Sequence, residues 1–388
     1  TLLYAALIKE QPELWAKVLT PVFNTLLNGG SIPPDWEGRV RVPIFKNKGS
    51  IGDPKNYRMI SLLPIPSKIF ARHILLSLEE WAYEGGIMPR EQIGFRKGHS
   101  TLDGCLALRR LAQAQLDKKR RLYVAFIDLS MAFDTINRAK LWLKLIEWKI
   151  PWGLLKLIIL LHENAWTKVS LGQSGALTTK IPTPNGLRQG CILAPILLSL
   201  FIADALVAIQ KVRAFPPKLG EESMSAIFYA DDTVLLDQTP IGLQRQLEAF
   251  SIYCQLNDLI INSSKTQVTI FAHPKNKISF KNWFIKGQRL EVTKSYRYLG
   301  VHFTDSLSFK EHFRLQEGKA LAIAAALKKL DAALAYNSVS TLMKLYNAKI
   351  VPLLLYGSEI MLEKEVKRLT TIELRIWNKW LNIPSGSN

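Results

Sequence analysis

Two adjacent carboxylates, Asp231 and Asp232, interrupt a run of otherwise apolar, strand-forming residues, SAIFYADDTVLL (225–236). The apolar residues on both sides predict two short strands joined by a tight turn with the Asp-Asp pair at its tip. Two like charges on a largely buried hairpin repel each other, and a divalent cation with oxygen ligands relieves that repulsion. The pair therefore predicts a Mg²⁺ site, although Asp is also common in solvent-exposed turns.

A third carboxylate, Asp128, ends the strand-like segment YVAFID (123–128), where alternation groups it with Val124 and Phe126. An Asp after a strand is often a helix N-cap, but Asp134 suits that role better because it stands just before the next helical segment. Two cations about 4 Å apart need ligands from more than one element. Asp128 together with the Asp-Asp pair therefore predicts a two-metal site for nucleotidyl transfer.

The composition narrows the class of partner. The chain has 388 residues, of which 48% are hydrophobic and 21% charged, so a packed core in one large or two to three smaller domains is expected. A formal net charge of +19 favours a polyanion, either nucleic acid or an anionic membrane surface. The three cysteines lie far apart without a CxxC pair, which predicts neither zinc nor disulfides and fits a reducing compartment.

One stretch is long enough to span a membrane, CILAPILLSLFIADALVAI (191–209). It contains Pro195 and Asp204, so we interpret it as a buried helix of a soluble domain and expect no membrane association. No secretory signal opens the chain, and it begins at Thr1 inside an apolar helical pattern. It is therefore expected to be a segment of a longer protein.

The elements that must position these residues follow from the hydrophobic periodicity. The predicted helices cover residues 1–30, 65–81, 101–121, 137–148, 194 onward and 243–257. The predicted strands and hairpins cover residues 40–45, 122–129, 169–181, 225–236, 267–271 and 296–303. Beyond about residue 304, Ala-, Leu- and Lys-rich segments have a helical period and no strand signals. The sequence thus predicts an α+β region with an antiparallel sheet, followed by a helical one.

Eight motifs in a fixed order resemble the reverse transcriptases of non-LTR (LINE-type) retrotransposons across nearly the whole chain. They are NYRMISLLP (56–64), QIGFRKGHST (92–101), AFIDLSMAFD (125–134), GLRQGCILAP (186–195), FYADD (228–232), INSSKT (261–266), YLG (298–300) and LLYGSEI (354–360). The first seven are shared with several reverse transcriptase groups. LLYGSEI and the following ELRIWNKWLNIP indicate the LINE type.

The resemblance implies a right-hand polymerase, with fingers and palm over residues 1–304 and a helical thumb and the start of a C-terminal region over 305–388. It implies an RNA template, a DNA primer or target, dNTPs as substrates and two Mg²⁺ ions, with Mn²⁺ as a substitute. An endonuclease is expected on a missing part of the parent chain. Such a protein is expected in the nucleus and in a cytoplasmic ribonucleoprotein.

The resemblance also implies roles for single residues. Asp128, Asp231 and Asp232 would hold the metals. Phe133 would be the steric gate that excludes the ribonucleotide 2′-hydroxyl. The other implied roles are triphosphate binding by Lys46 and Arg58, the nucleotide pocket at Gln189 and Gly190, protonation of pyrophosphate by Lys265, the primer grip at Tyr298, Leu299 and Gly300, and template or fingers contacts by Arg96.

Some positions depart from the family's usual pattern. Met59 and Ile192 stand where Pro is common, and Asp258 stands where Gly is common. None of these is an expected metal ligand. Two alternatives stay open. One is a decayed or domesticated copy that binds nucleic acid without catalysis, against which the intact carboxylates argue. The other is a reverse transcriptase of the group II intron or retron type, which the LLYGSEI region disfavours.

Overall fold

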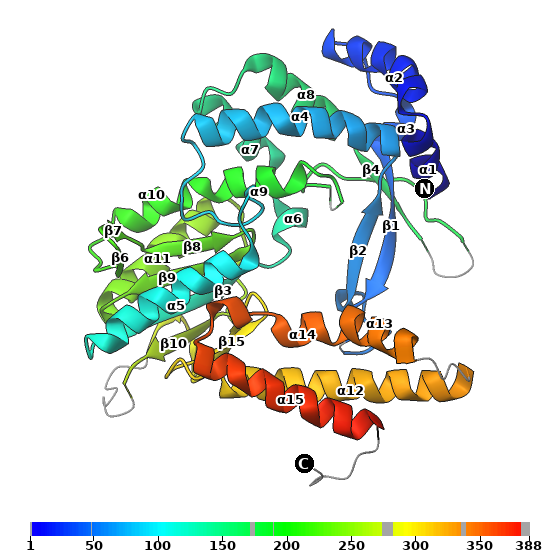
Figure 1. Ribbon diagram of the computed structural model, residues 1–388. Coiled ribbons are helices and arrows are strands. Elements are labelled where there is room, and N and C mark those ends of the chain that lie inside the picture. Colours follow the sequence, from blue (N-terminus) through cyan, green and yellow to red (C-terminus); the bar gives the residue numbers. More distant parts are fainter. Residues whose placement is uncertain are drawn as a thin grey trace.

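The computed structural model describes residues 2–47, 49–170, 175–188, 190–273, 282–334 and 339–381. It contains a five-stranded sheet with the order β13-β10-β3-β9-β8, of which β8, β9, β3 and β10 are labelled at the left of Figure 1. All of its strand pairs are antiparallel except β10 with β13. Its strands are β3 (Leu122–Asp128), β8 (Ala226–Tyr229), β9 (Asp232–Asp237), β10 (Gln267–Phe271) and β13 (Glu291–Thr293). This confirms the α+β class with an antiparallel palm sheet.

The central strand β3 separates two hydrophobic cores, because alternate side chains point to opposite faces of a sheet. Val124 and Phe126 pack in one core with α5 (Thr101–Asp117) and residues of the C-terminal helices. Tyr123, Ala125 and Ile127 pack in the other core, with α9 (Ala194–Ala203) and α11 (Pro240–Leu256). Every residue of β3 is buried except Asp128, which is partly exposed at its end. The buried strand therefore ends in a carboxylate, Asp128, that lies at the surface.

A second, four-stranded sheet with the order β2-β1-β4-β5 lies beside the palm and forms the fingers. Its strands are β1 (Gly38–Phe45), β2 (Tyr57–Leu62), β4 (Trp166–Val169) and β5 (Ile181–Pro182). The sequence prediction treated residues 46–58 as one loop and missed β2. The predicted hairpin at 169–181 is present as the antiparallel pairing of β4 with β5, and residues 171–174 lie outside the described residues.

Two predicted helices are interrupted in the structure. The first 30 residues form α1 (Leu2–Glu10) and α2 (Pro12–Leu27), because Pro12 has no N–H to continue a helix and suits its first turn. The apolar stretch forms α9 and α10 (Ala205–Gln210), which meet at Asp204. Among the described residues, no helix has the length and apolar content needed to cross a membrane.

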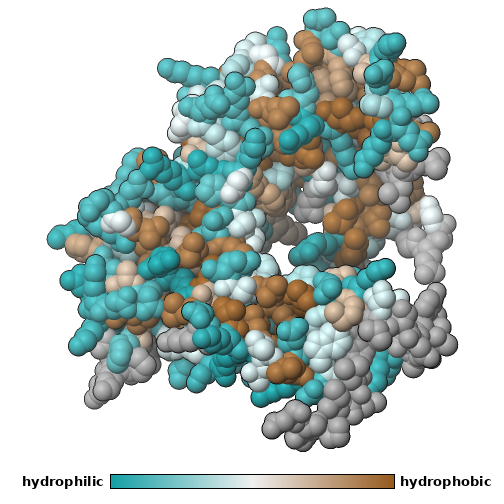
Figure 2. Space-filling model, viewed as in Figure 1, coloured by the Kyte–Doolittle hydropathy of each residue, from teal (hydrophilic) through white to brown (hydrophobic). Residues whose placement is uncertain are grey.

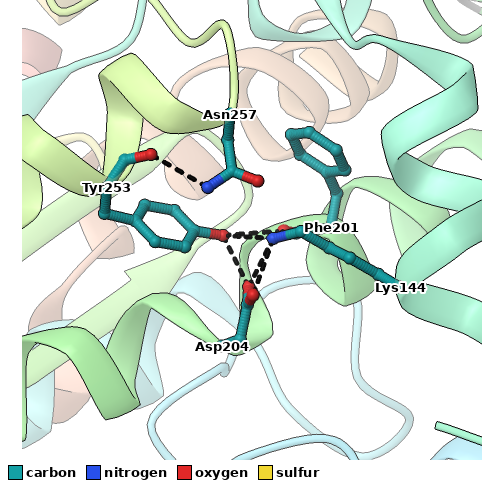
Figure 3. Close-up of polar contacts among 5 residues, drawn as sticks. All are labelled: Lys144, Phe201, Asp204, Tyr253 and Asn257. Carbon is teal, nitrogen blue, oxygen red and sulfur yellow. Dashed lines mark hydrogen bonds and ion pairs between the residues drawn. The ribbon is translucent and has the colours of Figure 1, made fainter. Parts of the chain in front are cut away.

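A buried polar network accounts for the polar residue between α9 and α10 (Figure 3). Lys144 reaches in from α7 (Arg138–Glu147), and its Nζ lies 2.7 Å from Asp204 Oδ1, 2.9 Å from the Tyr253 hydroxyl and 3.0 Å from the Phe201 carbonyl oxygen. The Tyr253 hydroxyl, from α11, donates to Asp204 Oδ1 at 2.6 Å. Burial lowers the pKa of Lys144, and Asp204 opposes that shift. The network ties three palm helices together through one charge pair.

Four helices follow the palm and form the thumb: α12 (Lys310–Leu334), α13 (Val339–Lys349), α14 (Val351–Leu355) and α15 (Glu363–Leu381). The space-filling view shows the molecule hollowed between the fingers strands and these helices (Figure 2). Ile44, Ile60 and Leu62 of β1 and β2 remain exposed. Arg109 of α5 forms an ion pair with Glu365 of α15 at 3.2 Å, which links palm and thumb.

The remaining elements are short, apart from two helices of the fingers. They are α3 (Pro34–Glu37), η1 (Pro54–Asn56), α4 (Ile65–Glu84), α6 (Ala132–Thr135), α8 (Trp152–His162), β6 (Lys218–Leu219), β7 (Glu222–Ser223), β11 (Phe284–Ile285), β12 (Gln288–Arg289), β14 (Ser295–Tyr298), β15 (Val301–Thr304) and η3 (Ser358–Ile360).

Candidate active site

Three carboxylates meet where β3 ends and β9 begins. In the register of these antiparallel strands, Asp128 lies directly opposite Asp232, so both side chains project from the same face. Tyr229 pairs with Asp232, which leaves Ala230 and Asp231 as the two residues of the hairpin turn. The prediction of a tight hairpin is confirmed, but the Asp-Asp pair does not form its tip. Ala230 takes the left-handed position of the turn at φ 55°, and Asp232 already belongs to the strand.

The carboxylates interact strongly enough to disturb their own ionisation. Loss of solvent around Asp232 raises its pKa to about 6, and the charges of Asp231 and Asp128 add to the shift. Burial also raises the pKa of Asp231, with a further contribution from Asp128, while its own backbone N–H and Arg58 oppose the rise. Three like charges are thus held together with too little positive charge to balance them.

Lys265 supplies one positive charge to this group. Its Nζ lies 3.5 Å from Asp128 Oδ2, on a side chain that is 68% exposed. The segment carrying it is fixed to β3, because the Asn262 N–H donates to the Asp128 carbonyl oxygen at 2.9 Å. The structure therefore brings Lys265 next to one of the three predicted metal ligands. Its role in protonating pyrophosphate stays a prediction.

The donor set fits a hard divalent cation. Carboxylate oxygens are the preferred ligands of Mg²⁺, and a cation would oppose the burial and the repulsion that raise the pKa of Asp231 and Asp232. Within the described ranges, no three His, Cys, Asp or Glu side chains already stand in a group able to hold a metal. Lys265 already pairs with one oxygen of Asp128, and its side chain is 68% exposed.

Residues 91–95, which lie between α4 and α5, pack against the β8–β9 turn that carries Ala230 and Asp231. Ile93 N–H donates to the Phe228 carbonyl oxygen at 2.9 Å, and Phe228 N–H donates to the Glu91 carbonyl oxygen at 2.9 Å. A Cβ added to Gly94 would lie 2.5 Å from the Ala230 nitrogen, so only glycine fits against the carboxylate turn. The sequence analysis assigned no role to Gly94, although it lies in the quoted QIGF motif. The guanidinium of Arg96, the predicted template residue, lies 5.2 Å from the centre of the Tyr83 ring on α4.

The predicted triphosphate residues lie on the fingers hairpin. Arg58 belongs to β2, and its charge opposes the rise that burial causes in the pKa of Asp231. Lys46 follows β1, and its backbone N–H donates to the Asn56 carbonyl oxygen at 2.8 Å. Gly190 has a φ of +99°, and a Cβ there would lie 2.6 Å from the Ser61 carbonyl oxygen of β2. Gln189 lies outside the described residues.

Phe133, the predicted steric gate, lies on the single turn α6 and packs partly buried against the core. Its carbonyl oxygen accepts the Leu187 N–H at 2.6 Å, next to the predicted nucleotide pocket. The prediction that Asp134 caps the following helix is wrong. Asn137 is that cap, since its side chain accepts the Lys140 N–H, whereas Asp134 forms an ion pair with Arg41 of β1 at 2.9 Å.

The predicted primer grip forms the turn between β14 and β15. Leu299 and Gly300 are its two tip residues, with φ of 44° and 90°. The Tyr356 hydroxyl, from the LLYGSEI motif, donates to the Leu299 carbonyl oxygen at 2.6 Å. Tyr298 is buried, and its neighbour Tyr296 stacks on Phe126 with 4.0 Å between ring centres. Burial raises the pKa of Tyr296 to about 12, with smaller contributions from Asp232 and Asp128 that place this hairpin near the carboxylates.

Comparison with known proteins agrees with this geometry. A family model described as reverse transcriptase (RNA-dependent DNA polymerase) matches residues 45–303. The RNA-directed DNA polymerase from mobile element jockey of Drosophila melanogaster is 26% identical over 366 residues, covering 91% of this chain and 38% of the relative. The probable RNA-directed DNA polymerase from transposon X-element of the same species is 26% identical over 383 residues, covering 96% of this chain and 40% of the relative. The chain thus spans about two fifths of each relative's length.

Among solved structures, one similar to this chain is apo telomerase from Candida tropicalis, truncated from its C-terminal domain. The match covers 76% of this chain and 59% of the telomerase chain. The TM-score is 0.49 and the sequence identity 13%.

Proposed function

Because the chain belongs to the reverse transcriptase (RNA-dependent DNA polymerase) family, we propose that it extends the 3′ end of a DNA primer by copying an RNA template. The observation that carries the proposal is the register that sets Asp128 opposite Asp232, beside Asp231 in the turn. The relatives named for mobile elements support a role in a LINE-type retrotransposon. The nicking endonuclease would lie on another part of a longer protein.

Enzymes of this family use divalent metal ions, and we propose that Asp128, Asp231 and Asp232 hold two Mg²⁺ ions here. Such ions lower the pKa of a primer 3′-hydroxyl and stabilise the charge of the leaving pyrophosphate. The three carboxylates are suited to hold them, because their mutual repulsion is relieved only by added positive charge. Lys265 is the one cationic side chain that forms an ion pair with them in the part of the chain described. Once displaced from Asp128, it can donate a proton to pyrophosphate.

The incoming nucleotide would bind between the fingers hairpin and α6. Arg58 and Lys46 would bind its triphosphate, with Arg58 already close enough to influence Asp231. Gly190 lets the backbone approach β2 closely, which would shape one wall of the pocket. The Phe133 ring would lie against the sugar and leave no room for a 2′-hydroxyl.

The primer would be held by the turn at Leu299 and Gly300. This turn is held between Tyr356 of the thumb side and α5 of the palm: a Cβ at Gly300 would lie 2.8 Å from the Tyr356 ring, and one at Gly104 of α5 would lie 3.1 Å from the Leu299 side chain. A turn packed this closely can hold a primer end without moving. The hollow between fingers and thumb is the natural place for an RNA–DNA hybrid (Figure 2).

Primer extension on poly(rA)/oligo(dT) with dTTP tests the proposal. We expect Mg²⁺-dependent DNA synthesis that EDTA abolishes, and a loss of about 10³-fold or more in Asp231→Ala, since removing one electrostatic stabiliser costs about that much. Asp305→Ala is the matched control, because it removes a half-buried carboxylate elsewhere. No synthesis by the folded chain, or synthesis that Asp231→Ala leaves intact, would contradict the proposal and support binding without catalysis.

A further inference from the structure

One ion pair connects the turn that carries Phe133 to the fingers sheet. Arg41 Nη2 of β1 lies 2.9 Å from Asp134 Oδ1, and the two residues are 93 positions apart in the chain. Their side chains are 17% and 26% exposed, so the pair is largely shielded from water. Asp134 directly follows Phe133 on the single turn α6. The ion pair to Asp134 therefore restrains the backbone that orients the Phe133 ring.

The palm side of this turn is held by backbone contacts. Leu187 N–H donates to the Phe133 carbonyl oxygen at 2.6 Å, and Gly186 N–H donates to the Ile136 carbonyl oxygen at 2.8 Å. A Cβ at Gly186 would lie 2.5 Å from the Asp134 carbonyl oxygen. These contacts fix the position of the backbone and do not involve the carboxylate of Asp134. The fingers side is held through that carboxylate.

The charge of Asp134 also acts on a second, buried arginine of β1, Arg39. Arg39 is 2% exposed, and its Nε and Nη1 have no hydrogen-bond partner among the residues that the structure describes. Burial lowers the pKa of Arg39 to about 9, with further lowering by Arg41, Arg188 and Arg138, and Asp134 is the one carboxylate that opposes this shift. Asp134 therefore offsets part of the positive charge that acts on Arg39, while Arg41 makes the direct contact.

We propose that Arg41 and Asp134 are positioning residues that hold the Phe133 ring against the nucleotide sugar and thereby set the discrimination between dNTPs and rNTPs. This inference rests on the proposed polymerase function and on Phe133 as its gate. A steric gate depends on position, because a ring displaced by about 1 Å leaves room for one more oxygen. The pair also connects the gate to β1, the strand beside the proposed triphosphate residues.

The test compares kcat/KM for dUTP and UTP on poly(rA)/oligo(dT), two substrates that differ only in the sugar. We expect Asp134→Asn and Arg41→Gln to lower the dUTP/UTP ratio about tenfold, with kcat for dUTP within about threefold of wild type. The double variant should be no lower than the lower single variant, because one contact is lost in each. Arg314→Gln is the matched control, since it breaks an Arg–Glu pair on the exposed thumb helix α12.

The ratio separates positioning from a general loss of structure. A partly unfolded enzyme loses activity toward both substrates equally, so its ratio stays at the wild-type value. If Asp134→Asn does not fold, Arg41→Lys replaces it, because lysine keeps the charge but not the planar fork of donors. It should give an intermediate ratio. A wild-type ratio in the folded variants, or additive losses in the double variant, would overturn the inference.

Phe133→Val distinguishes this failure from failure of the proposed function. If wild type makes DNA and Phe133→Val lowers the ratio while Asp134→Asn does not, the polymerase assignment stands and the positioning role is wrong. If wild type makes no DNA from dUTP, the proposed function itself is wrong.

Discussion

Replacement of Asp232 by Asn should stabilise the protein in the absence of metal, and only at neutral pH. The folded chain raises the pKa of this carboxyl from 3.8 to about 6, so it binds the proton more tightly than the unfolded chain does. Stability contributed by this group therefore falls as the pH rises from about 4 to about 6, and the loss is complete above about pH 6. Asn carries no charge to repel Asp231 and Asp128, and it avoids this loss.

The size of the effect follows from the pKa shift and from the exposure of the side chain. A shift of about two units corresponds to about 3 kcal/mol at neutral pH. Asp232 is exposed over more than a third of its surface, so solvent screening reduces this to about 1–1.5 kcal/mol. If 388 residues unfold together, the unfolding entropy is about 0.8 kcal/mol/K. The variant should then melt about 1–2 °C above wild type at pH 7.5.

Calorimetry in EDTA between pH 4 and pH 8 measures this difference, with Asp305→Asn as the matched control. Addition of Mg²⁺ should raise the Tm of wild type more than that of Asp232→Asn, because the cation relieves a repulsion that the variant lacks. The reasoning is refuted if the variant gains nothing at pH 7.5, if its gain persists at pH 4, or if Mg²⁺ shifts both proteins equally.

Two further predictions concern groups that hold the site in place. Lys144→Met should lower the free energy of unfolding by about 2–3 kcal/mol, because it leaves the Asp204 carboxylate without its charge partner. The double variant Lys144→Met with Asp204→Leu should recover most of that loss, because neither charge remains. Urea unfolding measures both free energies. Gly190→Ala should lower the free energy of unfolding by about 2–4 kcal/mol and reduce primer extension, because its φ of +99° and the Ser61 carbonyl oxygen exclude a Cβ. Gly153→Ala in α8, with open space around it, is the control and should change neither quantity. A wild-type Tm for Gly190→Ala would contradict this prediction.

The catalytic strands could be predicted because their signal is local. Apolar alternation and a strand-ending Asp128 are visible in a short window, and the register that pairs it with Asp232 follows from the tight hairpin. The tip of that hairpin was predicted one residue too late, since which residue takes the left-handed position depends on tertiary contacts. Here Gly94 packs against the Ala230 nitrogen and fixes the turn from outside the local sequence.

Contacts between distant segments could not be predicted. Asp134 looks like a helix cap from its neighbours alone, yet its partner Arg41 lies 93 positions earlier. The strand β2 was missed because its residues alternate in burial only when paired with β1. Likewise, Tyr356 was quoted as part of a motif, but its hydrogen bond to Leu299 appears only when the thumb packs on the palm. Asp134 and Tyr356 each have many possible partners in the sequence, and only the fold brings the actual ones together.

The segment from Asp128 to Asp134 joins two groups of like charge. At one end, burial and the charges of Asp231 and Asp128 raise the pKa of Asp232 to about 6. At the other end, Asp134 forms an ion pair with Arg41, and burial together with three other arginine charges lowers the pKa of Arg39 to about 9. Neither arrangement favours stability, because unbalanced charge in a partly buried place is costly. Both are explained if the carboxylates bind cations and the Arg41–Asp134 pair holds the α6 turn in position. Phe133 lies between them, so the same short segment would govern where metal binds and which sugar is accepted.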